Sequence, residues 1–314
     1  MDNQFKVIVL GSAGGLSEDN LSAYLIAPKH SDYFVSLDAG TLFSGLLKAR
    51  QAGSLDGIQV PEDSAMNVEG WTLTQLVKAY LISNAHLDHI TGLTINSTDD
   101  SAKNIVGLPE TIDFIRDHIF NWKVWPNFAD EGIGFHLKKY SFVRLSAEQE
   151  QPLAGTDMLV TPYPLSQSAY TQSTAFLIQS GGHYTLFIGN TGADNQQRRA
   201  NLDRLWERVA PLIRDRRLSG LFIEVSYPDG IPADPLFGNF TPQTMIRELE
   251  HLARRVDPGN PHGALADCSV VITSVRPLLT RGPSAETRIR EQLQTQNTLS
   301  ARFIVPEQGD YLEV

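Results

Sequence analysis

The chain has 314 residues, with 36 acidic and 26 basic side chains and a net charge of −10. This length allows two average domains or one large α/β domain. An acidic chain without a basic run is poorly suited to bind a nucleic-acid backbone, so we expect no nucleic-acid partner. The single cysteine, Cys268, excludes an internal disulfide. The sequence contains no stretch of about 18 apolar residues, so we expect no membrane span. The N-terminal residues lack the features of a signal peptide, which makes the cytoplasm the expected location.

Hydrophobic periodicity and turn residues predict strands in groups, with helices between the groups. In chain order we expect strands over 5–11, 22–28 and 33–40, a helix over 42–53, a strand over 79–83, a helix over 109–120, strands over 138–145, 156–164, 173–180 and 184–190, a helix over 195–215, a strand over 220–226, a helix over 241–256, a strand over 269–275, a helix over 284–296 and a strand over 301–307. No repeat or linker divides the chain. We therefore expect one α/β domain over 1–314, with an irregular aromatic-rich insertion near 120–136 and functional loops at strand ends.

Residues 83–92, Ser-Asn-Ala-His-Leu-Asp-His-Ile-Thr-Gly, place two histidines and an aspartate within four positions after an apolar run. Imidazole nitrogens and carboxylate oxygens are the ligands that zinc prefers, and several of them in one tight loop predict half of a metal site. The alternative is a surface loop in which Asp88 caps a short helix and the two histidines are ordinary surface residues. The motif by itself leaves both interpretations open.

Together with other motifs, the segment NAHLDHITGL (84–93) resembles the class II cyclic nucleotide phosphodiesterases of the metallo-β-lactamase superfamily. The resemblance extends, in order, through VLGSAGG (9–15), SLDAGT (36–41), NAHLDHITGL (84–93), GLPETIDFIRDHIFNWKVWPNF (107–128), STAFLI (173–178), FIGNTGAD (187–194), LFIEVSYPDG (221–230), LFGNFTP (236–242), VITSVRP (271–277) and PEQGD (306–310). It implies an αββα sandwich of the metallo-β-lactamase type, with two metal ions, usually zinc, in loops at one edge. In such a centre the ions clamp a phosphoryl group and lower the pKa of a shared water.

The resemblance implies seven metal-ligand positions, of which three are retained: His86, Asp88 and His89. The other four positions carry Asn84, Gln167, Asn190 and Ser274 in place of three histidines and a bridging aspartate. Asn239 replaces a histidine that assists the leaving group, so the implied catalytic positions are Asp88 and a degenerate Asn239.

Other positions of these motifs are expected to support the site. Arg276 occupies a lysine position of the family and is expected to contact a substrate phosphate. Asp38, Thr191 and Glu224 are expected to orient the site loops. The glycine-rich GSAGG (11–15) lacks the spacing of a phosphate-binding loop and is better interpreted as a tight turn.

These replacements predict a catalytically impaired or inactive relative of the 3′,5′-cyclic-nucleotide phosphodiesterases, which hydrolyse cyclic AMP or cyclic GMP to the 5′-nucleotide. The family uses two zinc ions, whereas here we expect none or one weakly bound divalent metal, because neutral amide oxygens hold zinc weakly. The alternative is an active phosphodiesterase with Mn²⁺ or Mg²⁺ at the residual Asp88 and His89. The expected partners are a cyclic nucleotide or another small phosphate ligand, no membrane, and a second copy in a homodimer.

Aromatic residues are concentrated at 121–128, where two tryptophans and a phenylalanine follow no regular period. They fit either core or subunit packing, which we favour, or stacking on a purine ring.

Overall fold

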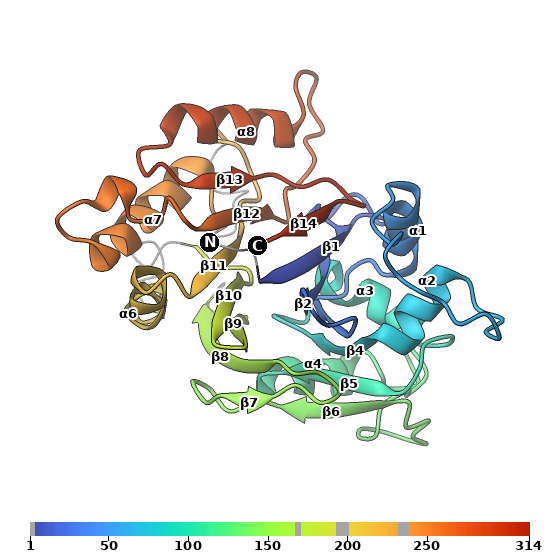
Figure 1. The fold of residues 1–314 in the computed structure, drawn as a ribbon. Coiled ribbons are helices and arrows are strands. Elements are labelled where there is room, and N and C mark those ends of the chain that lie inside the picture. The colour runs from blue at the N-terminus through green and yellow to red at the C-terminus, as the bar shows by residue number, and fades with distance from the viewer. Residues whose placement is uncertain (1–3, 167–170, 193–200, 232–238) are drawn as a thin grey trace.

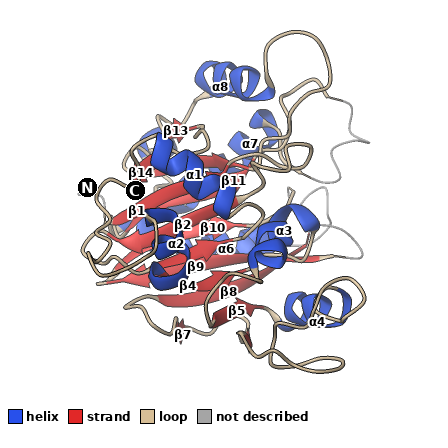
Figure 2. Ribbon diagram, turned by 90° about the vertical axis from the view of Figure 1, so that its right-hand side faces the viewer, coloured by secondary structure: helices blue, strands red, loops and turns tan. Residues whose placement is uncertain are grey.

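The computed structural model describes residues 4–166, 171–192, 201–231 and 239–314. Two sheets of seven strands each lie face to face, and helices cover their outer faces (Figures 1 and 2). This arrangement is the αββα sandwich that the sequence predicts.

The first sheet has the strand order β14-β1-β2-β3-β4-β5-β6. Its strands are β1 (Phe5–Gly11), β2 (Ala23–Pro28), β3 (Phe34–Leu37), β4 (Val77–Leu81), β5 (Lys103–Gly107), β6 (Tyr140–Arg144) and β14 (Tyr311–Glu313). Antiparallel pairing joins β14, β1, β2 and β3, whereas β3, β4, β5 and β6 run parallel. The parallel strands therefore present their carboxyl ends at one edge.

The second sheet has the order β13-β12-β11-β10-β9-β8-β7. Its strands are β7 (Gln151–Pro152), β8 (Leu159–Ser166), β9 (Gln172–Ser180), β10 (His183–Ile188), β11 (Leu218–Glu224), β12 (Ser269–Thr273) and β13 (Arg302–Ile304). Strands β10 to β13 are parallel. Their buried, β-branched and aromatic side chains suit a sheet that is covered on both faces.

Helices pack on the outer faces of the sheets. The helical segments are α1 (Phe43–Gln51), α2 (Val68–Trp71), η1 (Thr72–Leu76), α3 (Leu87–Asn96), α4 (Pro109–His118), α6 (Asn201–Arg214), α7 (Pro242–Val256), η3 (Pro261–Gly263) and α8 (Ala285–Gln296). Apolar side chains of α1, α3 and α4 form one core with the first sheet, and those of α6, α7 and α8 form a second core with the second sheet. A third core, rich in Phe and Val, fills the space between the sheets.

The structure corrects the sequence prediction at the histidine-rich motif. Helix α3 begins at Leu87, so Asp88 and His89 lie in its first turn rather than in a loop, and the N-cap is His86, not Asp88. The backbone of His86 is extended (ψ 149°), and the helix starts two residues earlier than a cap at Asp88 would place it. The Asp88 carboxylate in the first turn faces the positive end of the helix dipole.

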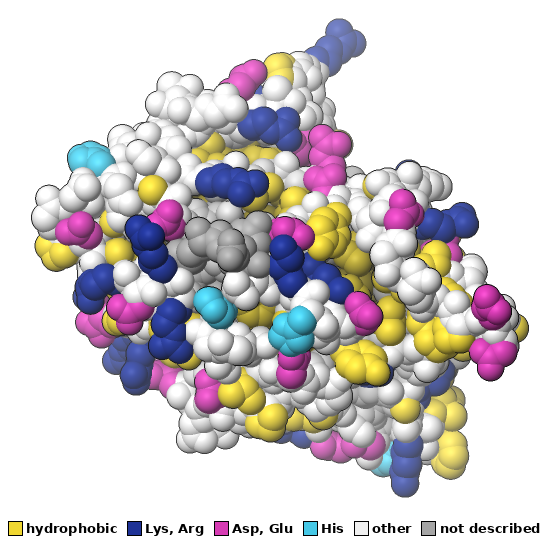
Figure 3. Space-filling view, in the orientation of Figure 1, with side chains coloured by type: hydrophobic (Ala, Val, Ile, Leu, Met, Phe, Trp, Pro, Cys, Tyr) yellow, Lys and Arg dark blue, Asp and Glu magenta, His cyan; other side chains and the backbone are white. Residues whose placement is uncertain are grey.

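The surface in Figure 3 carries Lys and Arg side chains interspersed with Asp and Glu. Among the described residues, no helix has both the length and the apolar composition needed to cross a membrane.

Candidate active site

The loop between β4 and α3 is closed by the side chain of Asn84. Its Oδ1 accepts a hydrogen bond from the backbone N–H of His86 at 3.0 Å, and its Nδ2 donates to the Oγ of Ser83 at 3.2 Å. The residue is fully buried. Both polar atoms of this amide are therefore used within the loop.

Asp38, which follows β3, connects this loop to helix α3. Its Oδ1 accepts from the Ser83 backbone N–H at 2.8 Å, while its Oδ2 accepts from the Ser83 hydroxyl at 2.9 Å and from His89 Nδ1 at 2.7 Å. Asp38 adopts a left-handed backbone (φ 54°), and a Cβ on the nearby Gly40 would lie 2.1 Å from the carbonyl oxygen of Asp88. Glycine is thus required for the close packing of this turn on α3.

His89 is oriented by the Asp38 contact. Because Nδ1 faces Asp38, the opposite ring nitrogen, Nε2, faces Asp88, whose Oδ1 lies 3.9 Å away. Burial alone would lower the pKa of His89, but the adjacent Asp38 carboxylate outweighs burial and raises the pKa to about 10. In contrast, burial and the neighbouring His89 lower the pKa of the half-buried His86.

Glu224 lies at the carboxyl end of β11, buried in the same region. Burial raises its pKa to about 7, although the charge of His89 opposes the shift. The hydroxyl of Ser226 donates to its Oε1 at 2.5 Å. The side chain of Glu224 is therefore buried and fixed by a hydrogen bond from Ser226.

The second sheet brings Asn190, Thr191 and Ser274 to the ends of β10 and β12, and all three are buried. The Oδ1 of Asn190 and the Oδ1 of Asn239 are buried and make no hydrogen bond with any described residue. A Cβ on Gly189 would lie 2.6 Å from the Cβ of Ser83, so the Asn190 turn packs directly on the Asn84 loop. The two sheets thus meet at the predicted site.

Arg276 lies at the rim of this region. Its guanidinium lies 6.0 Å from the ring centre of Tyr227 and beside Gly15, where a Cβ would approach Nη2 to 2.6 Å. Its backbone N–H donates to Ser226 at 2.9 Å. Among the described residues, no carboxylate forms an ion pair with Arg276.

The structure therefore brings together most of the predicted site, while Gln167 lies outside the described residues. Within the described part of the chain, no group of three or more His, Cys, Asp or Glu side chains is arranged to hold a metal ion. Sequence reasoning missed a cavity beside His86 that is lined by Phe114 and His118. The signal was present, because these two residues are four apart on a predicted helix and so share one face.

The predicted aromatic segment at 121–128 is irregular in the structure. Trp125 is half-buried and donates from its indole nitrogen to Ser97 Oγ at 2.9 Å, whereas the exposed Trp122 donates to the Phe135 carbonyl at 2.7 Å.

Comparisons with known proteins identify relatives over the whole chain. A family model described as cAMP phosphodiesterases class-II matches residues 4–309. A 3′,5′-cyclic-nucleotide phosphodiesterase of Aliivibrio fischeri is 39% identical over 310 residues, covering 98% of this chain and 92% of the relative. A probable 3′,5′-cyclic-nucleotide phosphodiesterase of Yersinia pestis is 36% identical over 306 residues, covering 98% and 88%.

Solved structures agree with the fold. Unliganded yeast PDE1 superposes with a TM-score of 0.84 at 20% identity, covering 99% of this chain and all (100%) of the yeast protein. The metallo-β-lactamase fold protein YhfI of Bacillus subtilis gives a TM-score of 0.62 at 13% identity, covering 100% of both chains. The chain has the metallo-β-lactamase fold and belongs to the class II cyclic-nucleotide phosphodiesterase family.

Proposed function

We propose that this protein binds a 3′,5′-cyclic nucleotide and hydrolyses it slowly or not at all, because its donor set does not fit two zinc ions. The relatives named above are phosphodiesterases of cyclic nucleotides, which supplies the ligand class. The observation that carries the proposal is the position of the Asn84 amide. Both of its polar atoms make hydrogen bonds inside the loop, and its neutral amide is a weak zinc ligand where the family has a histidine.

The remaining donors support the same conclusion. Asn190 offers a neutral amide oxygen where a carboxylate would bridge two cations, and neutral oxygens hold zinc weakly. The loss of even a group that only orients a ligand typically costs about 10- to 100-fold in metal affinity, so the loss of several ligands costs more. The retained His86, Asp88 and His89 do not complete either half of a dinuclear centre.

A second candidate function is hydrolysis with a single hard cation, such as Mn²⁺ or Mg²⁺. It is supported by the buried Oδ1 of Asn190, which no described residue satisfies, and by the retained Asp88 carboxylate beside His89. Carboxylate and amide oxygens suit such cations better than they suit zinc. This candidate requires that the unaltered protein hydrolyse cyclic AMP when Mn²⁺ or Mg²⁺ is added.

Phosphate binding does not require a metal in this proposal. Arg276 makes no ion pair with a described carboxylate, and a guanidinium can donate two parallel hydrogen bonds to a phosphate. The cationic His89 is paired with Asp38, so its charge is already balanced within the protein. Arg276 is therefore a described cationic side chain at the rim whose charge no described carboxylate balances.

The deciding experiment measures metal content and turnover of cyclic AMP in protein purified without chelator and then supplied with Zn²⁺, Mn²⁺ or Mg²⁺. We expect substoichiometric zinc and turnover far below that of the Aliivibrio fischeri relative measured in parallel. A matched variant restores the family ligands: Asn84→His, Gln167→His, Asn190→Asp, Asn239→His and Ser274→His. This variant should gain stoichiometric zinc, with circular dichroism to verify its fold. Two zinc ions and relative-like turnover in the unaltered protein would overturn the proposal, whereas turnover with Mn²⁺ alone would favour the second candidate.

A further inference from the structure

A cavity of about 250 Å³ opens beside the retained histidine loop, between helix α4 and the start of β9. It is lined by His86, by Glu110, Phe114 and His118 on one face of α4, and by Gln172. We infer that this cavity receives the purine base of a cyclic nucleotide, with Phe114 as the stacking platform and the phosphate directed toward His86. The inference rests on the proposed function, and it adds the site and residues that recognise the base.

The aromatic side chains of α4 provide the first argument. Phe114 is 42% exposed, and its side chain lines the cavity. Its ring centre lies 5.6 Å from that of His118, with an angle of 35° between the two planes. The Phe114 ring, with the tilted His118 ring beside it, offers an aromatic face at the cavity, and any nucleobase can stack on such a face because every base has a π-face.

The size of the cavity supports a base rather than a whole nucleotide. Its volume is below the roughly 300–1,000 Å³ that typical small-molecule sites enclose. A flat ring system can enter this space while the sugar and phosphate remain at the strand ends, beside the loop that carries His86. Because His86 lines the cavity, the cavity is continuous with the loop at the strand ends.

The charges in the cavity define the direction of the ligand. Glu110 is an exposed carboxylate whose Oε1 accepts from the Gln172 backbone N–H at 3.4 Å. A carboxylate repels a phosphate, but it accepts hydrogen bonds from the amino hydrogens of a base. The part of the cavity that contains Glu110 therefore suits the base, and the phosphate belongs beside His86.

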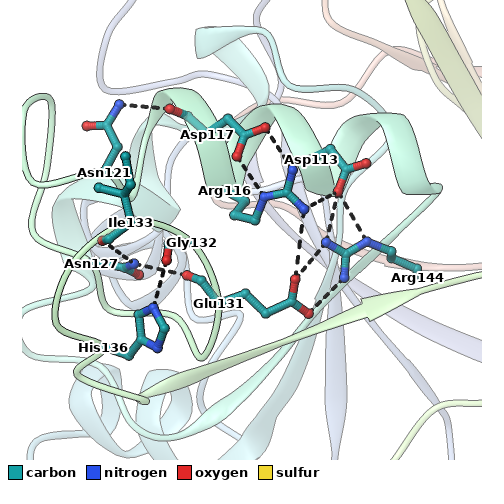
Figure 4. A network of polar contacts seen from close by, with 10 residues as sticks. All are labelled: Asp113, Arg116, Asp117, Asn121, Asn127, Glu131, Gly132, Ile133, His136 and Arg144. Carbon is teal, nitrogen blue, oxygen red and sulfur yellow. Dashed lines mark hydrogen bonds and ion pairs between the residues drawn. The ribbon is translucent and has the colours of Figure 1, made fainter.

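A network of charged and polar contacts joins helix α4 to β6 and to Glu131 (Figure 4). Arg144, from β6, donates through Nη2 to Asp113 Oδ1 of α4 at 2.8 Å and to Glu131 Oε2 at 2.8 Å. Arg116 of the same helix donates to Asp113 and Asp117. Each pair is partly exposed and contributes little alone, but a network with bidentate geometry fixes orientation. A helix held in this way presents a preorganised face to a ligand, which lowers the entropic cost of binding.

The test uses isothermal titration of cyclic AMP and cyclic GMP into the full chain in the presence of EDTA, so that binding is measured without hydrolysis. Phe114→Ala should weaken binding about 5- to 100-fold, the range expected for loss of one base–aromatic stack. Phe114→Tyr keeps the ring and should bind within about threefold of the unaltered protein, a difference of under 1 kcal/mol. Phe135→Ala is the matched control, because Phe135 is 73% exposed and does not line this cavity.

The outcomes separate this inference from the proposed function. Equal affinity of Phe114→Ala and Phe135→Ala, in a protein that binds cyclic nucleotides, would overturn the base pocket and leave the proposed function standing. The absence of any binding by the unaltered protein would overturn both the pocket and the binding part of the proposal. Relative-like turnover in the separate metal assay would overturn impaired catalysis alone. Retention of affinity by Phe114→Tyr with loss in Phe114→Ala supports stacking rather than a general structural effect.

Discussion

The buried carboxylate of Asp38 joins the Asn84 loop to helix α3, and the substitution Asp38→Asn tests how much this connection stabilises the protein. Asp38 is 0% exposed and accepts hydrogen bonds from the backbone and hydroxyl of Ser83 and from His89 Nδ1, at 2.8, 2.9 and 2.7 Å. Asparagine keeps one acceptor oxygen but replaces the other with an amino group. At least one donor would then face another donor, and His89 would lose its counterion.

The expected loss follows from these contacts. Removing one partner of a buried ion pair typically costs about 3–5 kcal/mol, and a buried donor without a partner costs about 1–3 kcal/mol. His89 can release its proton in the variant, which limits the penalty, so we expect a decrease of about 3 kcal/mol in the free energy of unfolding. This is a large share of the roughly 5–15 kcal/mol that stabilises a typical protein.

Equilibrium urea unfolding measures this change, followed by tryptophan fluorescence and far-ultraviolet circular dichroism, whose transitions must coincide for a two-state treatment. The matched control is Asp32→Asn, because Asp32 pairs with Lys6 at 3.0 Å but has a 79% exposed side chain. Exposed pairs contribute about 0–1 kcal/mol, so the control should unfold almost as the unaltered protein does. If Asp38→Asn is no less stable than Asp32→Asn, the buried contacts of Asp38 do not hold the site together and the reasoning fails.

Two further predictions concern a buried ion pair and the rim of the site. Lys103 and Asp100 form a contact of 2.7 Å with side chains 1% and 0% exposed, so Asp100→Asn should cost about 3 kcal/mol at pH 7. Burial lowers the pKa of Lys103, and loss of the carboxylate lowers it further. The unfolded variant then binds more protons than the folded variant, so the stability of Asp100→Asn rises with pH. Its deficit in unfolding free energy relative to the unaltered protein should therefore shrink between pH 7 and 9.5. A deficit that grows with pH would contradict this sign. Arg276→Ala should weaken cyclic-AMP binding in EDTA about tenfold or more, as expected for loss of charged hydrogen bonds, while Arg302→Ala, an exposed arginine on β13, should not. Equal affinities of these two variants would remove Arg276 from the binding site.

Most of the fold could be predicted from the sequence because its long strands are apolar on both faces. The segments of β1, β9 and β11 are buried almost throughout, and each contains an apolar run that the sequence displays: VIVL, AFLI and LFI. Strand β5 was missed because it is short and begins with Lys103, a residue type that is rarely buried. Its burial depends on Asp100 and on the Leu73 carbonyl, which accepts from Nζ at 2.6 Å. Such partners are set by tertiary structure and leave no local pattern.

The candidate site was predictable in its residues but only partly in its geometry. The motifs identified the residues that gather at the strand ends, because the carboxyl ends of parallel strands share an edge. They did not indicate that Asn84 turns both of its amide atoms into its own loop. The sequence also predicted the helix that carries Phe114. It did not predict the cavity beside this helix, because the lining includes Gln172, which is distant along the chain.

The proposed function gives the neutral side chain of Asn190 a further physical consequence, if the site holds no pair of cations. The region already buries the carboxylates of Asp38 and Glu224, and burial raises the pKa of Glu224 to about 7. An aspartate in place of Asn190 would add another buried anion at the end of the neighbouring parallel strand. Burying an unpaired charge costs far more than burying a neutral amide, even when the amide oxygen lacks a partner. Under the proposed function, asparagine at this position would therefore spare a metal-free site the repulsion of one more buried carboxylate.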